Sequence, residues 1–537
     1  MDDFTTYYAS LLDGAYTCVD RIVVDAYYPL GQTAGGFRTW WRTFQRDDEL
    51  TTKHLLRFAA RFSRSARAWA REHGIPVIFC RKGVQKVRMH KVAEAHLPKD
   101  PSFRGVFLVL VSREPGPVWQ VGAFPSGAMD LRARQPWPYV HYYYFHLIDP
   151  DWGHVAIGVC SHPPFRARIL LNGHEWVARQ ATHRGLAHRK LGNCFVDVQD
   201  PQALTALADR LTDQHIRAVC ERWIYGLCFG LSVAEQRLSN FRYAYSVAQV
   251  EDSYNLLFTS PRTMDDVYQR VIDQTRRTLT PRTIRTVFGR VHRGQYPKWV
   301  EVRLNRPQYN MTIMKVLYGT TTIKLYDKDE RVLRIEGISA NTSHLRVGRS
   351  LERFPRMVAA LRAYTIAFLN QLHAAHHAFL DYGTLDTLRQ STTRGSRRIP
   401  GLDMDKPRCR ALLQAVTTLA PAAEGFTNAD FRAVVQSIVP ADTPYSARTA
   451  SYDLAKLVAK DIIVRAPRTR RYILTPTGMR TAVGLLVLRG RLLEPILSGI
   501  RLHPQTEHPE NLSPLDQKYL ALGQALEEVC REIGIAA

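Results

Sequence analysis

The residues best suited to chemistry lie between positions 137 and 177, where histidines and acids interrupt an aromatic stretch that begins WPYVHYYYFHLIDPDWGH. These residues are His141, His146, His154, His162, His174, Asp149, Asp151 and Glu175. Imidazoles and carboxylates hold divalent metals, and a held metal can activate water against a phosphodiester. The patch therefore predicts a metal-dependent nuclease site, with Asp149 and Asp151 as catalytic acids, His141 and His146 as ligands, and Mg²⁺ or Mn²⁺ as the metal. The stretch has no H-x-x-x-H or H-E-x-x-H motif, so structural hydrogen bonding is the alternative.

A second chemically distinctive stretch, RRTLTPRTIRTVFGRVHRGQYPKW, occupies residues 276–299 and contains no acid. Its cations are Arg276, Arg277, Arg282, Arg285, Arg290, Arg293 and Lys298. Cations of this density bind phosphates, and the interleaved Phe288, Tyr296 and Trp299 offer faces on which bases can stack. The stretch predicts nucleic-acid contact; an exposed basic helix and loop is the alternative.

The sequence IKLYDKDERVLRIE at 323–336 alternates apolar and polar residues about a D-K-D-E turn, which predicts a β-hairpin. It is similar to a hairpin in the replication initiators of rolling-circle plasmids and filamentous phages, where a tyrosine attacks a DNA phosphate beside a metal. The resemblance implies that Tyr326 is the nucleophile and Glu336 the catalytic and metal-binding acid. It also implies that Lys328 and Arg334 face phosphate. The initiators use a strand with two histidines one residue apart, which is replaced here by VHYYYFH, and a structural hairpin with a buried Arg–Glu pair is the alternative.

Three helical patterns follow residue 405: KPRCRALLQAVTTLA, GFTNADFRAVVQSIV and SARTASYDLAKLVAKD. The next residues, IIVRAPRTRRYIL, predict a hairpin with a basic tip, and Thr475 is the expected cap of a closing helix. This order of elements resembles a winged helix-turn-helix of the MarR type.

The resemblance implies that the third helix, 446–461, enters the major groove and that the hairpin reaches the backbone or the minor groove of DNA. The implied contacts from the helix are Arg448, Ser451, Tyr452, Lys456 and Lys460. Those from the hairpin are Arg465, Arg468, Arg470 and Arg471. A module that docks on protein or RNA is the alternative.

The secondary-structure elements that must position these residues are predicted to include both helices and strands. Residues 1–75 and 214–280 are expected to be mostly helical, with a helix at 50–74 whose arginine-rich face is either solvated or follows phosphates. Apolar runs at 75–80 and 105–113 predict buried strands. The fold class is therefore α+β and multidomain, with these boundaries: an α/β domain at 1–136, an α+β body with antiparallel sheet at 137–390, a linker at 391–404, a winged helix at 405–500 and a helical tail at 501–537.

The amino-acid composition indicates which class of partner the protein binds. The 537 residues carry a formal net charge of +24, which favours a polyanion such as nucleic acid. No apolar run is long enough for a membrane helix, so a cytoplasmic protein without a membrane partner is expected. The phrases LNGHEW, GNCF and VLRIE are similar to those of a widespread bacterial family of unassigned function, which implies a bacterial source.

The sequence thus predicts a nucleic-acid-binding protein, with DNA favoured and structured RNA as the second choice, of a mobile element or defence system. Two alternatives stay open. One is a metal-dependent nuclease or replication-initiator-like enzyme, and the other is an RNA-binding subunit of a ribonucleoprotein.

Overall fold

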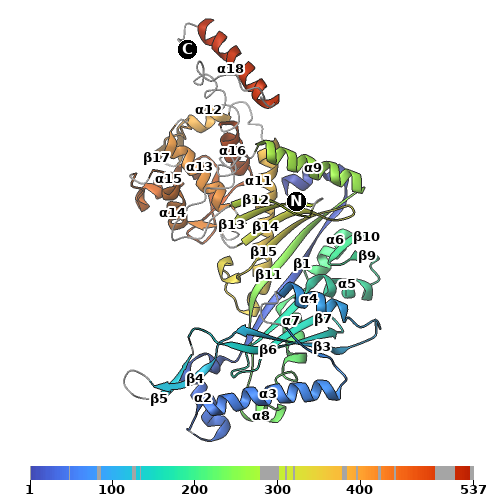
Figure 1. Ribbon diagram of the computed structural model, residues 1–537. Coiled ribbons are helices and arrows are strands. Elements are labelled where there is room, and N and C mark those ends of the chain that lie inside the picture. The colour runs from blue at the N-terminus through green and yellow to red at the C-terminus, as the bar shows by residue number, and fades with distance from the viewer. Residues whose placement is uncertain are drawn as a thin grey trace, which may run out of the picture. The chain divides into compact units, whose positions relative to one another are not determined.

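The structure is a computed structural model that describes residues 2–532 except Asp48, 81–85, 124–128, Arg134, 279–300, 309–310, 319–320, 378–383, 395–396, Asp405, Pro421, 423–424, 441–442 and 490–513. The chain divides into two compact units. The N-terminal unit comprises Gly14–Leu257 and Ile338–Leu361, and the C-terminal unit comprises Met1–Asp13, Phe258–Gly337 and Arg362–Ala537. Both units combine helices with β-sheet (Figure 1), in agreement with the predicted α+β class. The domain boundaries proposed from the sequence stay predictions.

A largely antiparallel sheet forms the N-terminal unit, with strand order β11-β1-β8-β7-β6-β3-β2 and a parallel pairing only between β2 and β3 among the described registers. Its strands are β1 (Leu12–Tyr27), β2 (Val77–Phe79), β3 (Gly105–Pro115), β6 (Tyr139–Asp149), β7 (Gly153–Cys160), β8 (Ala167–Asn172) and β11 (Ala244–Phe258). Two further strand pairs are β4 (Trp119–Ala123) with β5 (Met129–Ala133), and β9 (His188–Leu191) with β10 (Cys194–Val198).

The helices of this unit are α2 (Ala34–Gln45), α3 (Thr52–Glu72), α4 (Lys86–Ala95), α5 (Gly173–His183), α6 (Pro201–Ala208), α7 (Asp213–Ile224) and α8 (Val233–Leu238), with short 3₁₀ turns η2 (Pro29–Gln32), η3 (Thr342–Leu345) and η4 (Leu351–Arg353). Helix α3 buries Phe62 completely, and the Phe62 ring lies 5.3 Å from that of Tyr143 on β6. Apolar packing therefore fixes the inner face of α3 against the sheet.

The mostly helical prediction for residues 1–75 and 214–280 is wrong at two long strands. Strand β1 spans 16 residues and β11 spans 15. β-Branched residues such as Val23 and Val24 favour β1, and both lie buried in the sheet. Pairing with distant strands, which local periodicity does not encode, decides these segments.

The C-terminal unit contains a second set of strands in the order β12-β13-β14-β15. They are β12 (Glu301–Gln308), β13 (Met311–Tyr318), β14 (Thr321–Asp329) and β15 (Val332–Ser339), accompanied by α1 (Asp3–Tyr7), η1 (Ala9–Leu11), α9 (Pro261–Thr278) and α18 (Pro514–Glu532). Helix α11 (Phe354–His377) begins in the N-terminal unit and continues in this one from Arg362, and the last two residues of β15 are likewise assigned to the N-terminal unit. Strands β14 and β15 confirm the hairpin predicted at 323–336.

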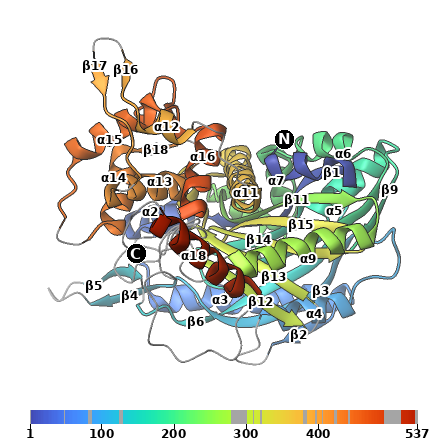
Figure 2. The ribbon, with the colours of Figure 1, turned by 90° about the horizontal axis from the view of Figure 1, so that it is seen from above.

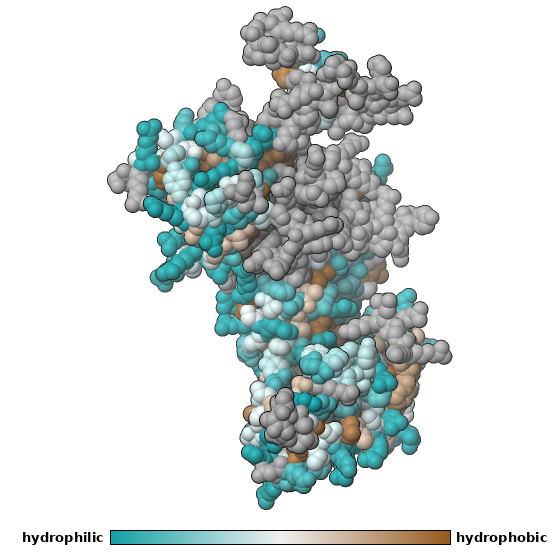
Figure 3. Space-filling view, turned by 60° about the vertical axis from the view of Figure 1, so that its left-hand side comes forward, coloured by the Kyte–Doolittle hydropathy of each residue, from teal (hydrophilic) through white to brown (hydrophobic). Residues whose placement is uncertain are grey.

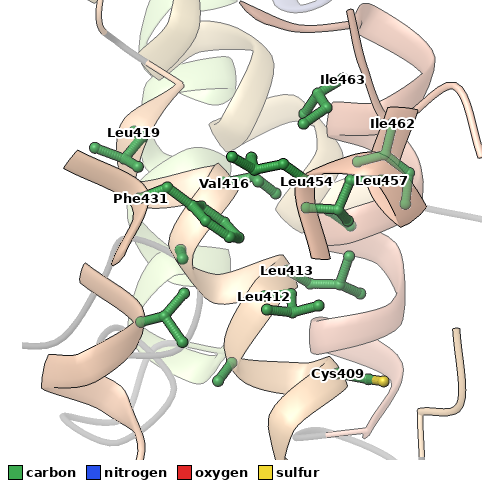
Figure 4. Close-up of a cluster of buried hydrophobic side chains, with 14 of the residues drawn as sticks. Cys409, Leu412, Leu413, Val416, Leu419, Phe431, Leu454, Leu457, Ile462 and Ile463 are labelled. Carbon is green, nitrogen blue, oxygen red and sulfur yellow. The ribbon is translucent and has the colours of Figure 1, made fainter. Parts of the chain in front are cut away.

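Residues 384–488 of this unit form a smaller assembly, called here the 384–488 module. Its elements are α12 (Thr384–Arg389), β16 (Thr392–Arg394), β17 (Arg397–Ile399), α13 (Pro407–Leu419), β18 (Phe426–Thr427), α14 (Asn428–Ile438), α15 (Ala447–Ala459), β19 (Ile463–Arg465), β20 (Arg471–Leu474) and α16 (Pro476–Leu488). Strands β18, β20 and β19 pair antiparallel in that order. The buried side chains of Leu413, Phe431, Leu454 and Ile463 join its helices and sheet in one apolar core (Figure 4).

The segment expected to be a linker is built into this module. Residues 392–394 and 397–399 pair antiparallel as β16 and β17, which Figure 2 shows extending from the module beside α12. The backbone N–H of Leu402 donates to the carbonyl of Leu388 at 2.7 Å, and both side chains are buried in the module core. A Cβ on Gly401 would lie 2.0 Å from the carbonyl oxygen of Arg389, so this close approach requires glycine. Apolar anchors on both sides therefore hold the Gly- and Arg-rich segment in place.

Within the described residues, every helix is too short or too polar to cross a bilayer.

Candidate nucleic-acid interface

Helix α15 presents one free face because its opposite face is committed to the core. Ser446 caps its first turn by accepting from the N–H of Thr449 at 3.1 Å. Ala450, Leu454 and Leu457 are fully buried, with the aliphatic and aromatic side chains of α13 and α14 in the same core. The helical period then turns Arg448, Ser451, Tyr452 and Ala455 outward, and all four are exposed. On the face of the module that Figure 3 shows, the described residues are mostly hydrophilic.

A buried carboxylate fixes the rotation of α15 about its axis. Asp453 is 1% exposed and accepts hydrogen bonds from Arg408 of α13, at 3.0 Å to Nε and 2.8 Å to Nη2. The Tyr445 hydroxyl donates to the same Asp453 oxygen at 2.7 Å. Burial, followed by this hydrogen bond, raises the pKa of Tyr445 well above its usual range. Because a charged group at this depth needs its partners, α15 is held in one orientation.

The first turn of α15 is also tied to the helix before it. The Asn428 amide, at the start of α14, donates to the Ser451 hydroxyl at 2.8 Å and to the Ala447 carbonyl at 3.3 Å. The Ser451 hydroxyl in turn donates to Ala447 at 3.0 Å. Ser451 therefore retains at most one accepting position for a ligand, whereas Arg448 keeps its guanidinium exposed in solvent.

Tyr452 and Lys456 form a pair on the exposed face. The Lys456 ammonium lies 4.9 Å from the centroid of the Tyr452 ring, and the tyrosine is 48% exposed. A cation over an aromatic face combines a phosphate-binding group with a surface that can stack on a base.

Exposed arginines form the tip of the β19–β20 hairpin. Arg468 has a backbone φ of 56°, the left-handed conformation that reverses the chain at this tip. Arg465 donates to the Thr469 carbonyl at 3.1 Å, which braces the loop, and residues 465–470 line an open hollow. Arg471 differs, since its guanidinium donates to the carbonyl of Gly425 at 2.9 Å and holds the hairpin to the strand that precedes α14.

Lys460 does not share this surface. Its ammonium donates to the carbonyls of Thr387 at 2.6 Å and Gln390 at 2.7 Å, at the end of α12, and burial lowers its pKa. Sequence reasoning also missed Arg394 and Arg398, which are exposed on the β16–β17 hairpin that packs beside α15. The arginines of STTRGSRRIPG are the sequence signal for this surface, although the polar, glycine-containing composition of the stretch predicts a linker.

The hairpin of β14 and β15 brings its predicted residues to one face. Glu336 accepts from Lys324 at 2.8 Å, so the period of two places Tyr326 and Lys328 on the Glu336 face as well. Arg334 lies on the same face of β15 but is completely buried, whereas a phosphate contact requires an accessible guanidinium. Glu336 is 6% exposed and already neutralised by Lys324.

The predicted catalytic acids Asp149 and Asp151 are held by structural contacts. Asp149 is completely buried and accepts from Arg222 at 2.7 Å and from the Trp223 indole at 2.8 Å. It also accepts from the backbone N–H groups of Asp151 and Trp152, and Arg222 binds Asp151 at 2.8 Å. The D-P-D-W turn is therefore locked to α7 by its own acids, which is the structural alternative named for this patch.

The two histidines predicted as ligands are separated on β6. His146 Nδ1 lies 3.0 Å from His154 Nε2, and burial lowers the pKa of His146 to about 3 and that of His154 to about 4. His141 is near the other end of the strand, where burial and then the charges of Arg113 and Arg67 lower its pKa. Among the described residues, histidine, cysteine and acid side chains form no group of three that could hold a metal. The structure places Glu336 in the other unit from these histidines.

The basic stretch at 276–299 is described only in part. Arg276 and Arg277 belong to the last turn of α9. The remaining predicted contacts, Arg282, Arg285, Arg290, Arg293 and Lys298, lie outside the described residues.

Comparison with known proteins gives no relative from which a role could be transferred. No protein-family model, no curated protein and no solved structure matches the chain.

Proposed function

We propose that this chain is a DNA-binding protein whose 384–488 module is a winged helix, with α15 as the helix that reads the major groove. The observation that carries the proposal is the exposed face of α15, where Arg448 and the Tyr452–Lys456 pair project from a helix whose orientation is fixed by Asp453.

The order of elements supports this assignment. Three helices are followed by a two-stranded hairpin and a closing helix, α13, α14, α15, β19–β20 and α16, and the turn between α14 and α15 is braced by Gln436. In a winged helix, the third helix presents its outer residues to base edges while the hairpin arginines contact the backbone. The three exposed tip arginines, Arg465, Arg468 and Arg470, fit the second role through charge alone.

The test is selection of duplexes from a randomised library by the full-length chain, followed by affinity measurements on the enriched sequence. Arg448→Gln should reduce affinity by about 1–3 kcal/mol and relax the preference at one position of the site. The triple change of Arg465, Arg468 and Arg470 to Gln should weaken binding to all sequences alike and lower the salt slope by about 2.7. Arg480→Gln, an exposed change on α16, is the matched control and should have little effect.

Three results would overturn the proposal. They are failure to enrich any sequence, an Arg480→Gln variant as weak as Arg448→Gln, and a discrete RNA that copurifies with the chain and competes with DNA. Cleavage of the selected duplex in the presence of Mg²⁺ or Mn²⁺ would show that the protein is a nuclease.

A further inference from the structure

The outer face of α3 carries a line of cations along its whole length. Lys53, Arg57, Arg64, Arg67 and Arg71 follow the i+3 and i+4 spacing of one helical face, with Ala60 filling the remaining position. At about 100° per residue, these positions fall within an arc of about 80°, and at about 1.5 Å per residue they span about 27 Å. All five side chains are exposed.

These five cations are not neutralised by the described part of the protein. The only acid in α3 is Glu72, its last residue, and the five residues form no ion pair with any described side chain. Arg61, which lies to one side of the line, shows the contrast, because both of its terminal nitrogens bind Glu235 of α8 at 2.8 and 2.6 Å. The protein pairs the arginine that joins two helices and leaves the outward ones charged and accessible.

The line is also rigid. Thr51 caps the first turn together with His54, and Phe62 packs within 6.1 Å of Phe165 and 5.3 Å of Tyr143, measured between ring centroids. The apolar face of α3 is thus occupied by the sheet, and Figure 1 shows the helix at the edge of the N-terminal unit. The backbone positions from which the charged side chains extend are therefore set before any ligand arrives, so binding orders side chains but not the helix itself.

The positive field extends beyond the helix. The charges of Arg113 on β3 and of Arg67 both lower the pKa of His141, after the effect of burial. Arg113 is exposed and pairs in register with His141 on β6. Arg113, near the end of β3, thus adds another cation to the region around Arg67.

We propose that the outer face of α3 is a second DNA-binding site, one that holds the phosphate backbone of a duplex without reading its sequence. A span of about 27 Å equals the rise of about eight base pairs along the duplex axis, and because each strand winds around that axis, the straight line of cations would meet phosphates of both strands across a groove. An anionic membrane is the weaker fit, because helices that bind bilayers bury an apolar face in them and the apolar face of α3 is already covered. The inference extends the proposed function but rests on the charges of α3 alone, not on the 384–488 module.

The experiment compares two full-length triple variants with the same change in charge. In the test variant, Arg57, Arg64 and Arg71 become Gln; in the control variant, the exposed residues Arg104, Arg184 and Arg210 become Gln. Affinity for a duplex of random sequence is measured between about 50 and 200 mM salt. Glutamine preserves helix propensity, and thermal unfolding of each variant checks that the fold is kept.

The test variant should bind the random duplex at least tenfold more weakly, with a salt slope lower by about 2.7, whereas the control variant should stay close to wild type. Equal losses in both triples would show a general effect of net charge and overturn the proposal. An unchanged affinity of the test variant, or a loss of binding to phosphatidylserine vesicles but not to DNA, would also overturn it. The two proposals are scored by different readouts: the proposed function by the sequence enriched from the library and its change in Arg448→Gln, and the α3 site by the salt slope on random duplex in the α3 triple variant, so either can fail while the other holds.

Discussion

Asparagine at position 453 should loosen α15 without changing the shape of the side chain. Asp453 accepts from Arg408 and from the buried Tyr445 hydroxyl, and an amide offers these donors a neutral oxygen and sets an NH₂ group in the same pocket. Hydrogen bonds to charged groups contribute about 1.5–3 kcal/mol, against about 1 kcal/mol for neutral ones. The Arg408 side chain is 46% exposed and regains hydration, so the expected loss for Asp453→Asn is about 2 kcal/mol in the local unfolding free energy of α15.

Hydrogen exchange followed by mass spectrometry on the full-length chain is the suitable assay, because it reports the opening of individual helices. Tryptophan fluorescence would not report this change, since residues 384–488 contain no tryptophan. Asp461→Asn is the matched control: the same chemical change at an exposed carboxylate just beyond the end of α15. Protection of α15 within about 0.5 kcal/mol of wild type in Asp453→Asn, or an equal loss in Asp461→Asn, would refute the role given to Asp453.

Three further perturbations test other parts of the fold. Burial lowers the pKa of His154 and His162 to about 4, so between about pH 4 and 6.5 the unfolded chain, whose histidines have a pKa near 6.5, binds protons that the folded chain does not. The free energy of unfolding, measured with urea, should therefore fall as the pH drops from about 6.5 to 4, by up to roughly 3 kcal/mol for each histidine, and a pH-independent value would contradict this. Gly478→Ala would place a Cβ 2.0 Å from the carbonyl oxygen of Ile462, so hydrogen exchange of α16 should accelerate, with a cost of about 1–3 kcal/mol; unchanged exchange would exclude the clash. Phe62→Ala should cost about 3–5 kcal/mol in urea unfolding followed by tryptophan fluorescence, and a loss below about 1 kcal/mol would show that α3 is not packed as described.

Local signals predicted the helices and the β19–β20 hairpin of residues 407–488 closely, but not α12 or the β16–β17 hairpin before them. Thr475 caps α16 by accepting from the N–H of Gly478 at 2.8 Å, as expected from its place before Pro476. The helix predicted at 446–461 is α15, Ala447–Ala459, because its apolar residues follow the helical period. Caps and periodicity act over a few residues, and for that reason a single sequence reveals them.

The parts that the sequence did not reveal depend on distant partners. Arg222 reaches Asp149 across 73 positions of the chain, and this contact turns a candidate catalytic acid into a structural one. Likewise, Arg408 and Asp453 lie 45 positions apart in the chain, so the contact between them that orients α15 could not be predicted from the sequence. The residue types and their spacing at these sites are compatible with a catalytic or a structural role, and only the contacts in the folded structure distinguish the two.

The contact of Lys460 with the end of α12 has a practical consequence for dissecting the protein. A fragment that begins at residue 405 would lack Leu388 and Leu402, and would leave the ammonium of Lys460 without the two carbonyls it binds. Such a fragment would lose two buried leucines from its core and the tie between α12 and the end of α15, the helix proposed to contact DNA. The smallest fragment that folds on its own should therefore start before α12. Any fusion protein that carries the module would then also contain the basic hairpin β16–β17.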